Sequence, residues 1–244
     1  MRTGVIYQKR LPEYGRLQVV DIKEEGEMIR LLLVDDVRES AMYLDPELRA
    51  EPAFKYQNRM RVIFDDAPWI KDTLMFGGAG FTYPKVYLAR YPERNIDVVE
   101  LMPQMEEIAR QFFFLEDDPR LQIHIDDAIH YMEESSKQYD VIFNDAFIAD
   151  RMDRGLQSSY SVGLVKKHLR PDGIYAINLL GEIFGEGAMP GRLFRKMLAE
   201  EFENTLLLRT REDISIAEKQ NFLLIASDRE LGYLAKRSNE LKMA

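Results

Sequence analysis

The spacing of hydrophobic and polar positions divides the chain into two parts. Between residues 73 and 226, short apolar runs suited to buried strands alternate with stretches in which apolar residues recur every three or four positions. Expected strands include residues 121–125, 139–143, 174–180, 205–208 and 222–226, and expected helices include 103–113, 126–134, 158–169 and 190–202. This alternation predicts an α/β fold with a mainly parallel sheet covered by helices on both faces.

The first 45 residues have no helical periodicity. Residues 16–22, 27–34 and 37–43 are expected to form three strands joined by short polar turns, which predicts an antiparallel meander. Because such a sheet must cover its apolar face, we expect it to pack on the main domain or on a second subunit. A predicted helix over residues 53–64 follows. We therefore expect a β domain over residues 1–50 and a second domain over 51–244.

Residues 73–100 have the order of a nucleotide-binding βαβ unit. An apolar run is followed by Gly77, Gly78 and Gly80, an expected helix, and a second apolar run that ends at Glu100. Glycines at this place allow a sharp turn and let backbone N–H groups approach a ligand. Glu100 follows Gly80 by about 20 residues, the spacing at which an acid reaches a ribose hydroxyl. A glycine turn without a ligand is the alternative, but the complete order favours nucleotide binding.

Polar residues also follow two later expected strands. Ligands of open parallel sheets bind beyond the carboxyl ends of the strands, where Asp126, Asp127, Asn144 and Asp145 are expected. Asp126 or Asp127 could instead cap the next helix, and Asp145 could stabilise a turn. A carboxylate at Asp145 could also accept a proton from an attacking nucleophile or hold a cationic amine.

Composition and charge exclude several classes of site. The 244-residue chain has no cysteine, which excludes disulfides, thiolate metal sites and cysteine nucleophiles. Its formal net charge of -9 argues against a nucleic-acid partner and is compatible with a cationic small molecule. The three histidines lack metal-ligand spacing, so we expect no metal. With neither a signal segment nor an apolar run of about 18 residues, we expect a cytoplasmic protein without a membrane partner.

Six segments, taken in order, resemble the spermidine synthase family. They are YGRLQVVD at residues 14–21, YQNRM at 56–60, GGAG at 77–80, DVVELMP at 97–103, DPRLQIHIDDA at 118–128 and YDVIFNDAF at 139–147. The resemblance covers about residues 14–180. It implies a methyltransferase-type Rossmann domain that binds an adenosyl ligand, preceded by a small β domain. We expect a homodimer formed through the N-terminal strands.

The resemblance also implies roles for individual residues. Gln18 and Glu100 would hold the ribose of an adenosyl sulfonium ligand, and Asp127 would meet the adenine amino group. Asp145 would be the base that prepares an attacking amine. We assign cofactor binding to Gln18, Gln57, Gly77, Gly78, Gly80, Glu100, Asp127 and Asn144, and catalysis to Asp145 and Tyr56.

Two departures from the family pattern bear on the reaction. Gly80 stands where the family's glycine loop carries an aspartate that grips the donor amine, and Ile148 stands where a second aspartate is expected. Two missing charge-assisted contacts could weaken cation binding by several kcal/mol, at about 1.5–3 kcal/mol each. Other acids, such as Asp150 or Glu182, could replace them.

Our first interpretation is methyl transfer from S-adenosylmethionine to a small nucleophile activated near Asp145 and Tyr56, since this reaction needs little beyond alignment. The first alternative is an aminopropyltransferase that makes a polyamine from an amine and decarboxylated S-adenosylmethionine. A second alternative is a non-catalytic adenosyl-ligand-binding or scaffold protein. An NAD-linked oxidoreductase fits less well, because GGAGFT does not follow GxGxxG.

Overall fold

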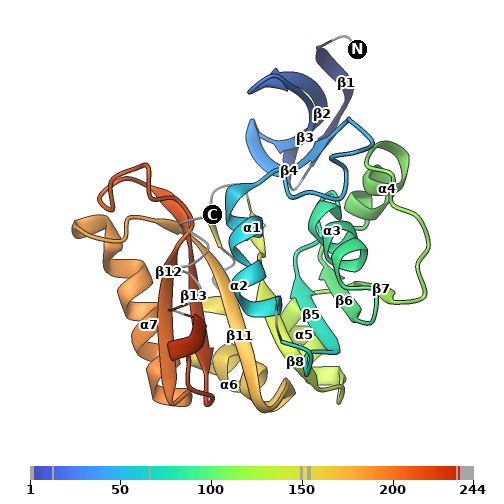
Figure 1. Ribbon diagram of the computed structural model, residues 1–244. Helices are drawn as coiled ribbons and strands as arrows, with labels where there is room; N and C mark the ends of the chain where they lie inside the picture. The colour runs from blue at the N-terminus through green and yellow to red at the C-terminus, as the bar shows by residue number, and fades with distance from the viewer. Residues whose placement is uncertain are drawn as a thin grey trace.

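Two sheets organise the chain, as the computed structural model in Figure 1 shows. The structure describes residues 3–12, 14–65, 67–148, 151–152, 155–234 and 236. A four-stranded sheet at the N-terminus precedes a seven-stranded sheet with helices on both faces. The α/β class predicted from the sequence is therefore confirmed.

The N-terminal sheet is an antiparallel meander in the order β1-β2-β3-β4. Its strands are β1 (Gly4–Leu11), β2 (Gly15–Glu24), β3 (Glu27–Val34) and β4 (Val37–Tyr43). The last three were predicted, but the prediction of only three strands was wrong. β1 escaped notice because Leu11 is its only buried residue, so it pairs with β2 without burying an apolar face of its own.

The apolar face of this sheet is covered by α4 (Pro103–Phe112). Leu17, Val19 and Leu32 from the sheet join Met105 and Ile108 of the helix in one hydrophobic cluster. This packing holds the N-terminal sheet over the main sheet (Figure 1). A domain boundary at residue 50 stays a prediction.

The main sheet has the strand order β12-β13-β11-β8-β5-β6-β7. Its strands are β5 (Asp72–Phe76), β6 (Asn95–Glu100), β7 (Leu121–Ile125), β8 (Tyr139–Asn144), β11 (Leu169–Gly181), β12 (Asn204–Arg209) and β13 (Gln220–Ser227). The pairs from β11 through β7 are parallel, whereas β13 is antiparallel to both of its neighbours. A short hairpin of β9 (Phe147–Ile148) and β10 (Arg151–Met152) follows β8.

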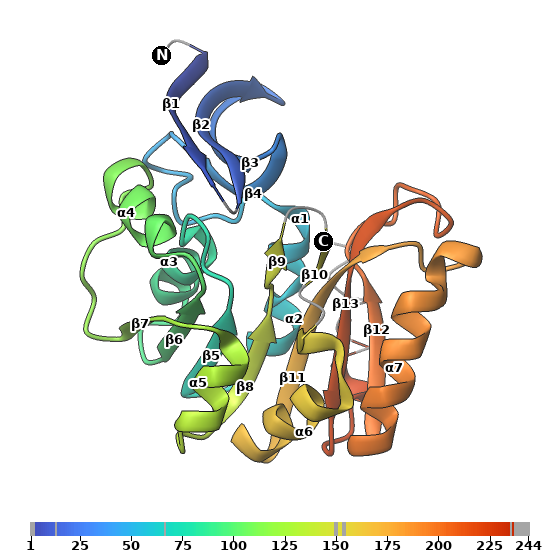
Figure 2. The ribbon, with the colours of Figure 1, turned by 180° about the vertical axis from the view of Figure 1, so that it is seen from behind.

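Helices cover both faces of this sheet, and each face has its own core. The helices are α1 (Lys55–Arg59), α2 (Arg61–Phe64), α3 (Thr82–Arg90), α5 (Ala128–Glu134), α6 (Ser159–His168) and α7 (Met189–Glu201), with short 3-10 turns at Gly155–Gln157 and Glu186–Ala188. Met75 packs in the core under α1 to α3, and its neighbours Leu74 and Phe76 pack in the core under α5 to α7. The side chains of consecutive strand residues thus lie on opposite faces of the sheet. Figures 1 and 2 show the helices on these two faces.

The ends of three neighbouring strands meet at one place. β5 lies between β6 and β8, and the chain reaches these neighbours by crossovers in opposite directions (Figure 2). Phe76, the last residue of β5, pairs with Val99 on one side and with Asn144 on the other. Such a switch point is where ligands of open α/β sheets bind. The glycine loop, Glu100 and Asp145 therefore lie side by side.

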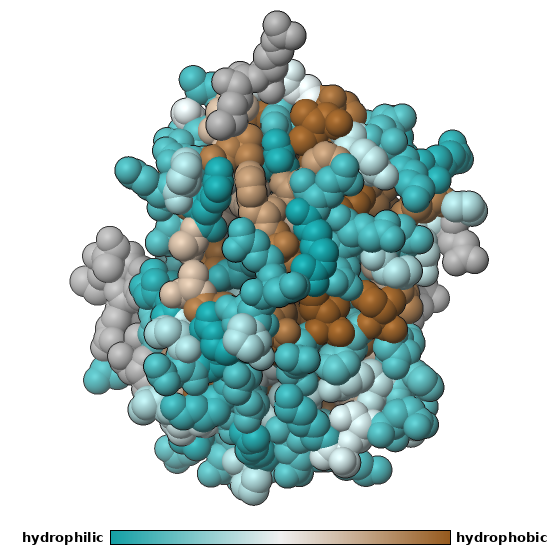
Figure 3. Space-filling model, turned by 90° about the vertical axis from the view of Figure 1, so that its right-hand side faces the viewer, coloured by the Kyte–Doolittle hydropathy of each residue, from teal (hydrophilic) through white to brown (hydrophobic). Residues whose placement is uncertain are grey.

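The side of the molecule next to α4 is mainly hydrophilic, with separate hydrophobic areas (Figure 3). The exposed large apolar side chains of β1 are Val5 and Ile6. Dimerisation through the N-terminal strands stays a prediction.

Within the described ranges, none of the helices has the length and apolar character needed to cross a membrane.

Candidate functional site

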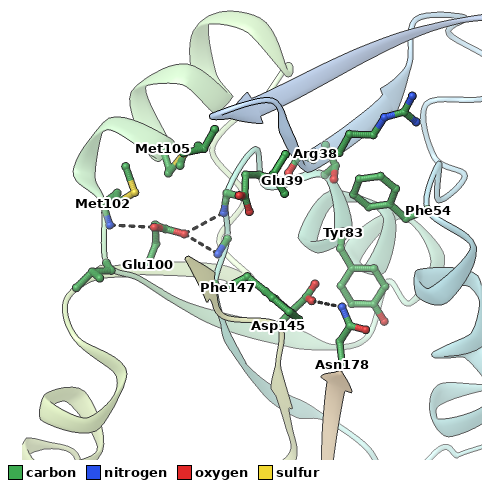
Figure 4. Close-up of a pocket in the computed structure, with 18 of the residues that line it drawn as sticks. Arg38, Glu39, Phe54, Tyr83, Glu100, Met102, Met105, Asp145, Phe147 and Asn178 are labelled. Atoms are coloured by element: carbon green, nitrogen blue, oxygen red, sulfur yellow. Dashed lines mark hydrogen bonds between the residues drawn. The ribbon is translucent and has the colours of Figure 1, made fainter. Parts of the chain in front are cut away.

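A cavity of about 510 Å³ lies between the N-terminal sheet and the switch point of the main sheet (Figure 4). This volume lies in the usual range for small-molecule sites. Its lining includes Arg38, Glu39, Phe54, Tyr56, Gln57, Gly77, Gly78, Tyr83, Glu100, Met105, Asp145 and Asn178. Both sheets and the helix α1 therefore contribute to one site.

Gly77 begins the loop at the end of β5 in a conformation that favours glycine. Its φ is 85°, and a Cβ atom there would lie 2.7 Å from the backbone oxygen of Asp145. A side chain would therefore be strained and would push against the neighbouring strand end. The glycine at this position keeps the loop and Asp145 close together.

Glu100 holds this loop through its carboxylate. Oε2 accepts hydrogen bonds from the N–H groups of Gly78 at 2.8 Å and Ala79 at 2.9 Å, and Oε1 accepts one from Met102 at 2.9 Å (Figure 4). Burial raises the pKa of Glu100, although these backbone hydrogen bonds oppose the rise. Oε2 already accepts two hydrogen bonds, whereas Oε1 accepts one from Met102, so a ribose hydroxyl could donate to Oε1 in addition.

Asp145 is fixed from two sides at the end of β8. The Tyr56 hydroxyl donates to Oδ2 at 2.7 Å, and Asn178 Nδ2 donates to Oδ1 at 2.7 Å. Burial raises the pKa of Asp145 to about 7, while both hydrogen bonds oppose the rise. A carboxyl with this pKa can gain or lose a proton near neutral pH, as a general base must.

Tyr56 acts as the proton donor in its contact with Asp145. Burial, and then the charge of Asp145, raise the pKa of Tyr56 well above its ordinary value, so the phenol keeps its proton. Gln57 Nε2 lies 3.3 Å from the Tyr56 hydroxyl. Gln57 is only 4% exposed, and its Oε1 atom is buried without a hydrogen-bond partner in the part of the chain that the structure describes. That amide oxygen is available to a donor group on a ligand.

Six of the ten residues assigned from the sequence line the cavity: Tyr56, Gln57, Gly77, Gly78, Glu100 and Asp145. Gln18 does not, because Leu17 and Val19 face the hydrophobic cluster and Gln18 points to the opposite face of β2. There its Nε2 donates to Gln8 Oε1 at 2.8 Å. The neighbouring residue that does line the cavity is Gly15.

Gly80, Asp127 and Asn144 also have local roles outside the cavity lining. The Gly80 N–H donates to Ser40 Oγ at 2.9 Å. Asp127 caps α5, because its side chain accepts hydrogen bonds from the first N–H groups of the helix, those of Ile129 and His130. Helix capping was the alternative role considered for this residue. Asn144 is completely buried and donates to the Tyr175 hydroxyl at 2.9 Å, which braces the strand end that carries Asp145.

Asn178 and Glu39 are among the residues of the site that the sequence analysis missed. Asn178 is the only polar residue in the apolar run IYAINLL at residues 174–180, and this isolation was an available signal. Asn221 Nδ2 donates to its Oδ1 at 3.0 Å, which orients the amide group toward Asp145. Glu39 reaches the cavity from β4, and no local pattern indicates this.

Of the two acids proposed to replace the family's missing charges, only Glu182 lies among the described residues. Glu182 is not among the cavity-lining residues, and its Oε2 accepts a hydrogen bond from the Gly187 N–H at 3.1 Å. Asp150 lies outside the described residues.

The importance of Gly77 can be tested by stability measurements. We expect Gly77→Ala to lower the free energy of unfolding by at least about 1–2 kcal/mol, the cost of a left-handed conformation for a residue with a Cβ atom. The close contact with Asp145 adds to this cost. Gly163→Ala is the matched control, because a Cβ in α6 at that position meets no atom within 4 Å. It should raise stability by about 0.5–1 kcal/mol. Urea unfolding of both variants measures these changes. A Gly77→Ala variant that is as stable as the wild type would contradict the prediction.

The chain is similar in sequence to proteins of known families. Residues 70–182 match the spermine/spermidine synthase domain. The chain is 29% identical over 185 residues to polyamine aminopropyltransferase 2 of Pseudomonas aeruginosa, a match that covers 71% of this chain and 48% of that protein. It is also 31% identical over 120 residues to the eEF1A lysine and N-terminal methyltransferase of Mus musculus, covering 44% of this chain and 17% of that protein.

The fold is similar to that of a probable spermidine synthase from Corynebacterium glutamicum. The TM-score is 0.77 at 19% sequence identity, and the match covers 94% of this chain and 81% of that one. The chain spans about half the length of the polyamine aminopropyltransferases that it matches. The matched domain contains the glycine loop, Glu100, Asp145 and Asn178, but not Glu39 and Tyr56. Residues 70–182 thus match a spermine/spermidine synthase domain, and the chain resembles spermidine synthase-like proteins in sequence and in fold.

Proposed function

We propose that the protein transfers an alkyl group from an adenosyl sulfonium donor to an amine, and that the alkyl group is aminopropyl. The observation that carries this proposal is Asp145, a carboxyl with a pKa raised to about 7 that Tyr56 and Asn178 orient within the cavity. The match of residues 70–182 to the spermine/spermidine synthase domain and the polyamine aminopropyltransferases among the similar proteins support the same class of reaction.

The charges of the cavity favour cationic ligands. Its described lining contains the acids Asp35, Glu39, Glu100 and Asp145, against one base, Arg38. The guanidinium of Arg38 is bonded to Glu24, with Nη2 and Oε2 2.7 Å apart. A ligand with one or more positive charges would therefore be attracted, and sulfonium and ammonium groups both meet this condition.

In the proposed reaction, Asp145 takes the proton that the attacking amine must lose. The donor supplies a carbon bonded to a positively charged sulfur; as the amine nitrogen bonds to that carbon, the carbon–sulfur electron pair remains on sulfur as a neutral thioether. Tyr56 and Asn178 keep the Asp145 oxygens in fixed directions, so that one oxygen can receive the proton. Glu100 and the glycine loop would hold the adenosyl ribose.

The bonds already made in the glycine loop favour the decarboxylated donor. S-adenosylmethionine carries a carboxylate that needs a cation or free N–H groups. The N–H groups of Gly78 and Ala79 are bonded to Glu100, and that of Gly80 to Ser40. We therefore prefer aminopropyl transfer to the methyl transfer that the sequence first suggested. Methyl transfer is the second candidate, because the chain shares 31% identity over 120 residues with a methyltransferase.

Thermal unfolding with separate ligands tests the proposal. We expect decarboxylated S-adenosylmethionine and methylthioadenosine to raise the melting temperature more than S-adenosylmethionine does, and NAD to have no effect. A ligand at about 100 times its dissociation constant should add roughly 2.7 kcal/mol of stability, a shift of a few degrees for a chain of this size. A preference for S-adenosylmethionine would favour methyl transfer. No shift with any adenosyl ligand would refute both candidates.

A further inference from the structure

Glu39 is an acidic side chain that lines the cavity. It lies on β4 and reaches the cavity from the N-terminal sheet, opposite the strand ends that carry Glu100 and Asp145 (Figure 4). Its Oε1 atom is buried and has no hydrogen-bond partner among the described residues. Arg38 precedes it in the chain, but its guanidinium pairs with Glu24. The structure thus leaves a carboxylate oxygen unsatisfied inside a ligand-sized space.

The surroundings of Glu39 are unfavourable for a negative charge. Burial, followed by the charges of Asp145 and Glu100, raises the pKa of Glu39 to about 8. Carboxylates that share a site repel each other, and a buried charge without a partner is costly. A cation bound between them would remove both effects. This is a reason to look for a ligand group rather than for a role in folding.

We propose that Glu39 binds the primary ammonium group of an alkylamine chain that occupies the cavity. This inference rests on the proposed function and deepens it by naming the residue that recognises the amine. The rings of Phe54 and Tyr83 also line the cavity, and aromatic faces attract ammonium groups. The ammonium belongs either to the aminopropyl chain of the donor or to a diamine acceptor.

The local structure explains why an acid from the N-terminal sheet would take this role. A Cβ atom at Gly80, where the family's loop carries an aspartate, would lie 3.0 Å from the Ser40 side chain, which already bonds the Gly80 N–H. A side chain at position 80 is therefore hindered. Glu39 is the chain neighbour of Ser40, so β4 supplies a carboxylate beside the same loop.

The test is calorimetric titration of the wild type and of Glu39→Gln, which keeps the size of the side chain and removes its charge. The probes are methylthioadenosine, which has no ammonium group, decarboxylated S-adenosylmethionine and putrescine. We expect Glu39→Gln to weaken binding of at least one of the two amines about tenfold to a hundredfold, the strength of a hydrogen bond between charged groups. Methylthioadenosine affinity should stay unchanged. Glu107→Gln, an exposed position on α4, is the matched control and should leave all three affinities unchanged.

The pattern of losses identifies which molecule carries the ammonium. A loss confined to the decarboxylated donor assigns Glu39 to the aminopropyl chain, and a loss confined to putrescine assigns it to the acceptor. Unchanged affinity for both amines, or an equal loss for methylthioadenosine, would overturn the proposal. A wild type that binds no adenosyl ligand would refute the proposed function. The effect of Glu39→Gln on putrescine affinity would then decide the role of Glu39. Absence of amine binding in the wild type would overturn that role as well.

Discussion

Asp145→Asn should lower turnover about 10²- to 10⁴-fold, the contribution of a general base, while donor affinity stays unchanged. The new amide cannot take up the amine proton. It can keep both contacts, because its oxygen can accept from Asn178 and its NH₂ group can donate to the Tyr56 hydroxyl. Release of methylthioadenosine from the decarboxylated donor measures turnover, and calorimetric titration measures donor binding. In the wild type, turnover should rise with pH up to about 7 as Asp145 loses its proton.

The same substitution should stabilise the fold in a pH-dependent way. Burial raises the pKa of Asp145 to about 7, whereas an aspartate in the unfolded chain titrates near about 3.9. Between about pH 4 and pH 7 the unfolded chain releases this proton while the native state keeps it, so the stability of the native state falls as the pH rises through this range. Removal of the carboxyl group should raise the melting temperature by several degrees at pH 8 and by little at pH 4. Such a gain in stability with loss of activity is common for functional residues.

Asp126→Asn is the matched control for this prediction. Asp126 also follows a strand end, but it lies outside the cavity lining and bonds His130 Nδ1 at 2.8 Å. Turnover should change little in this variant. If Asp145→Asn kept wild-type turnover, or lost donor binding as well, Asp145 would not be the base.

Most of the main sheet could be predicted because its central strands are buried on both faces and therefore read as apolar runs. The predicted strand over residues 121–125 and the helix beginning at Pro103 agree with β7 and α4. The sequence does not indicate the direction of β13, because an apolar run looks the same in parallel and antiparallel pairing. The helix predicted over residues 53–64 is two short helices that meet at Met60.

The site was less predictable than the fold, and the reasons differ between residues. The motif order located β2 correctly, but Gln18 and Gly15 are separated by an odd number of positions. The Gln18 side chain therefore lies on the face of β2 opposite to the one that borders the cavity at Gly15. Glu39 reaches the cavity only because the N-terminal sheet packs on α4, a contact between segments about 60 residues apart. No local pattern encodes such a contact.

Glu100→Ala should have the second largest effect, and its sign on stability should be opposite to that of Asp145→Asn. The substitution leaves the N–H groups of Gly78, Ala79 and Met102 without their acceptor. At about 1–3 kcal/mol for each unsatisfied buried group, the free energy of unfolding should fall by several kcal/mol. Urea unfolding without any ligand measures this loss. Glu106→Ala, which removes a partly exposed ion pair with Arg110, should cost less than about 1 kcal/mol.

Glu100→Ala should also abolish binding of adenosyl ligands, because the ribose loses its carboxylate and the loop loses its fixed shape. The two causes can be separated with Glu100→Gln, which keeps an oxygen for some of the loop N–H groups but places an NH₂ group against the others. Titration with methylthioadenosine at low temperature, where the variants remain folded, should show weaker binding for Glu100→Gln than for the wild type and none for Glu100→Ala. If Glu100→Ala lost stability but still bound methylthioadenosine with wild-type affinity, the carboxylate would only brace the loop, and the ribose contact would belong to other groups of the cavity.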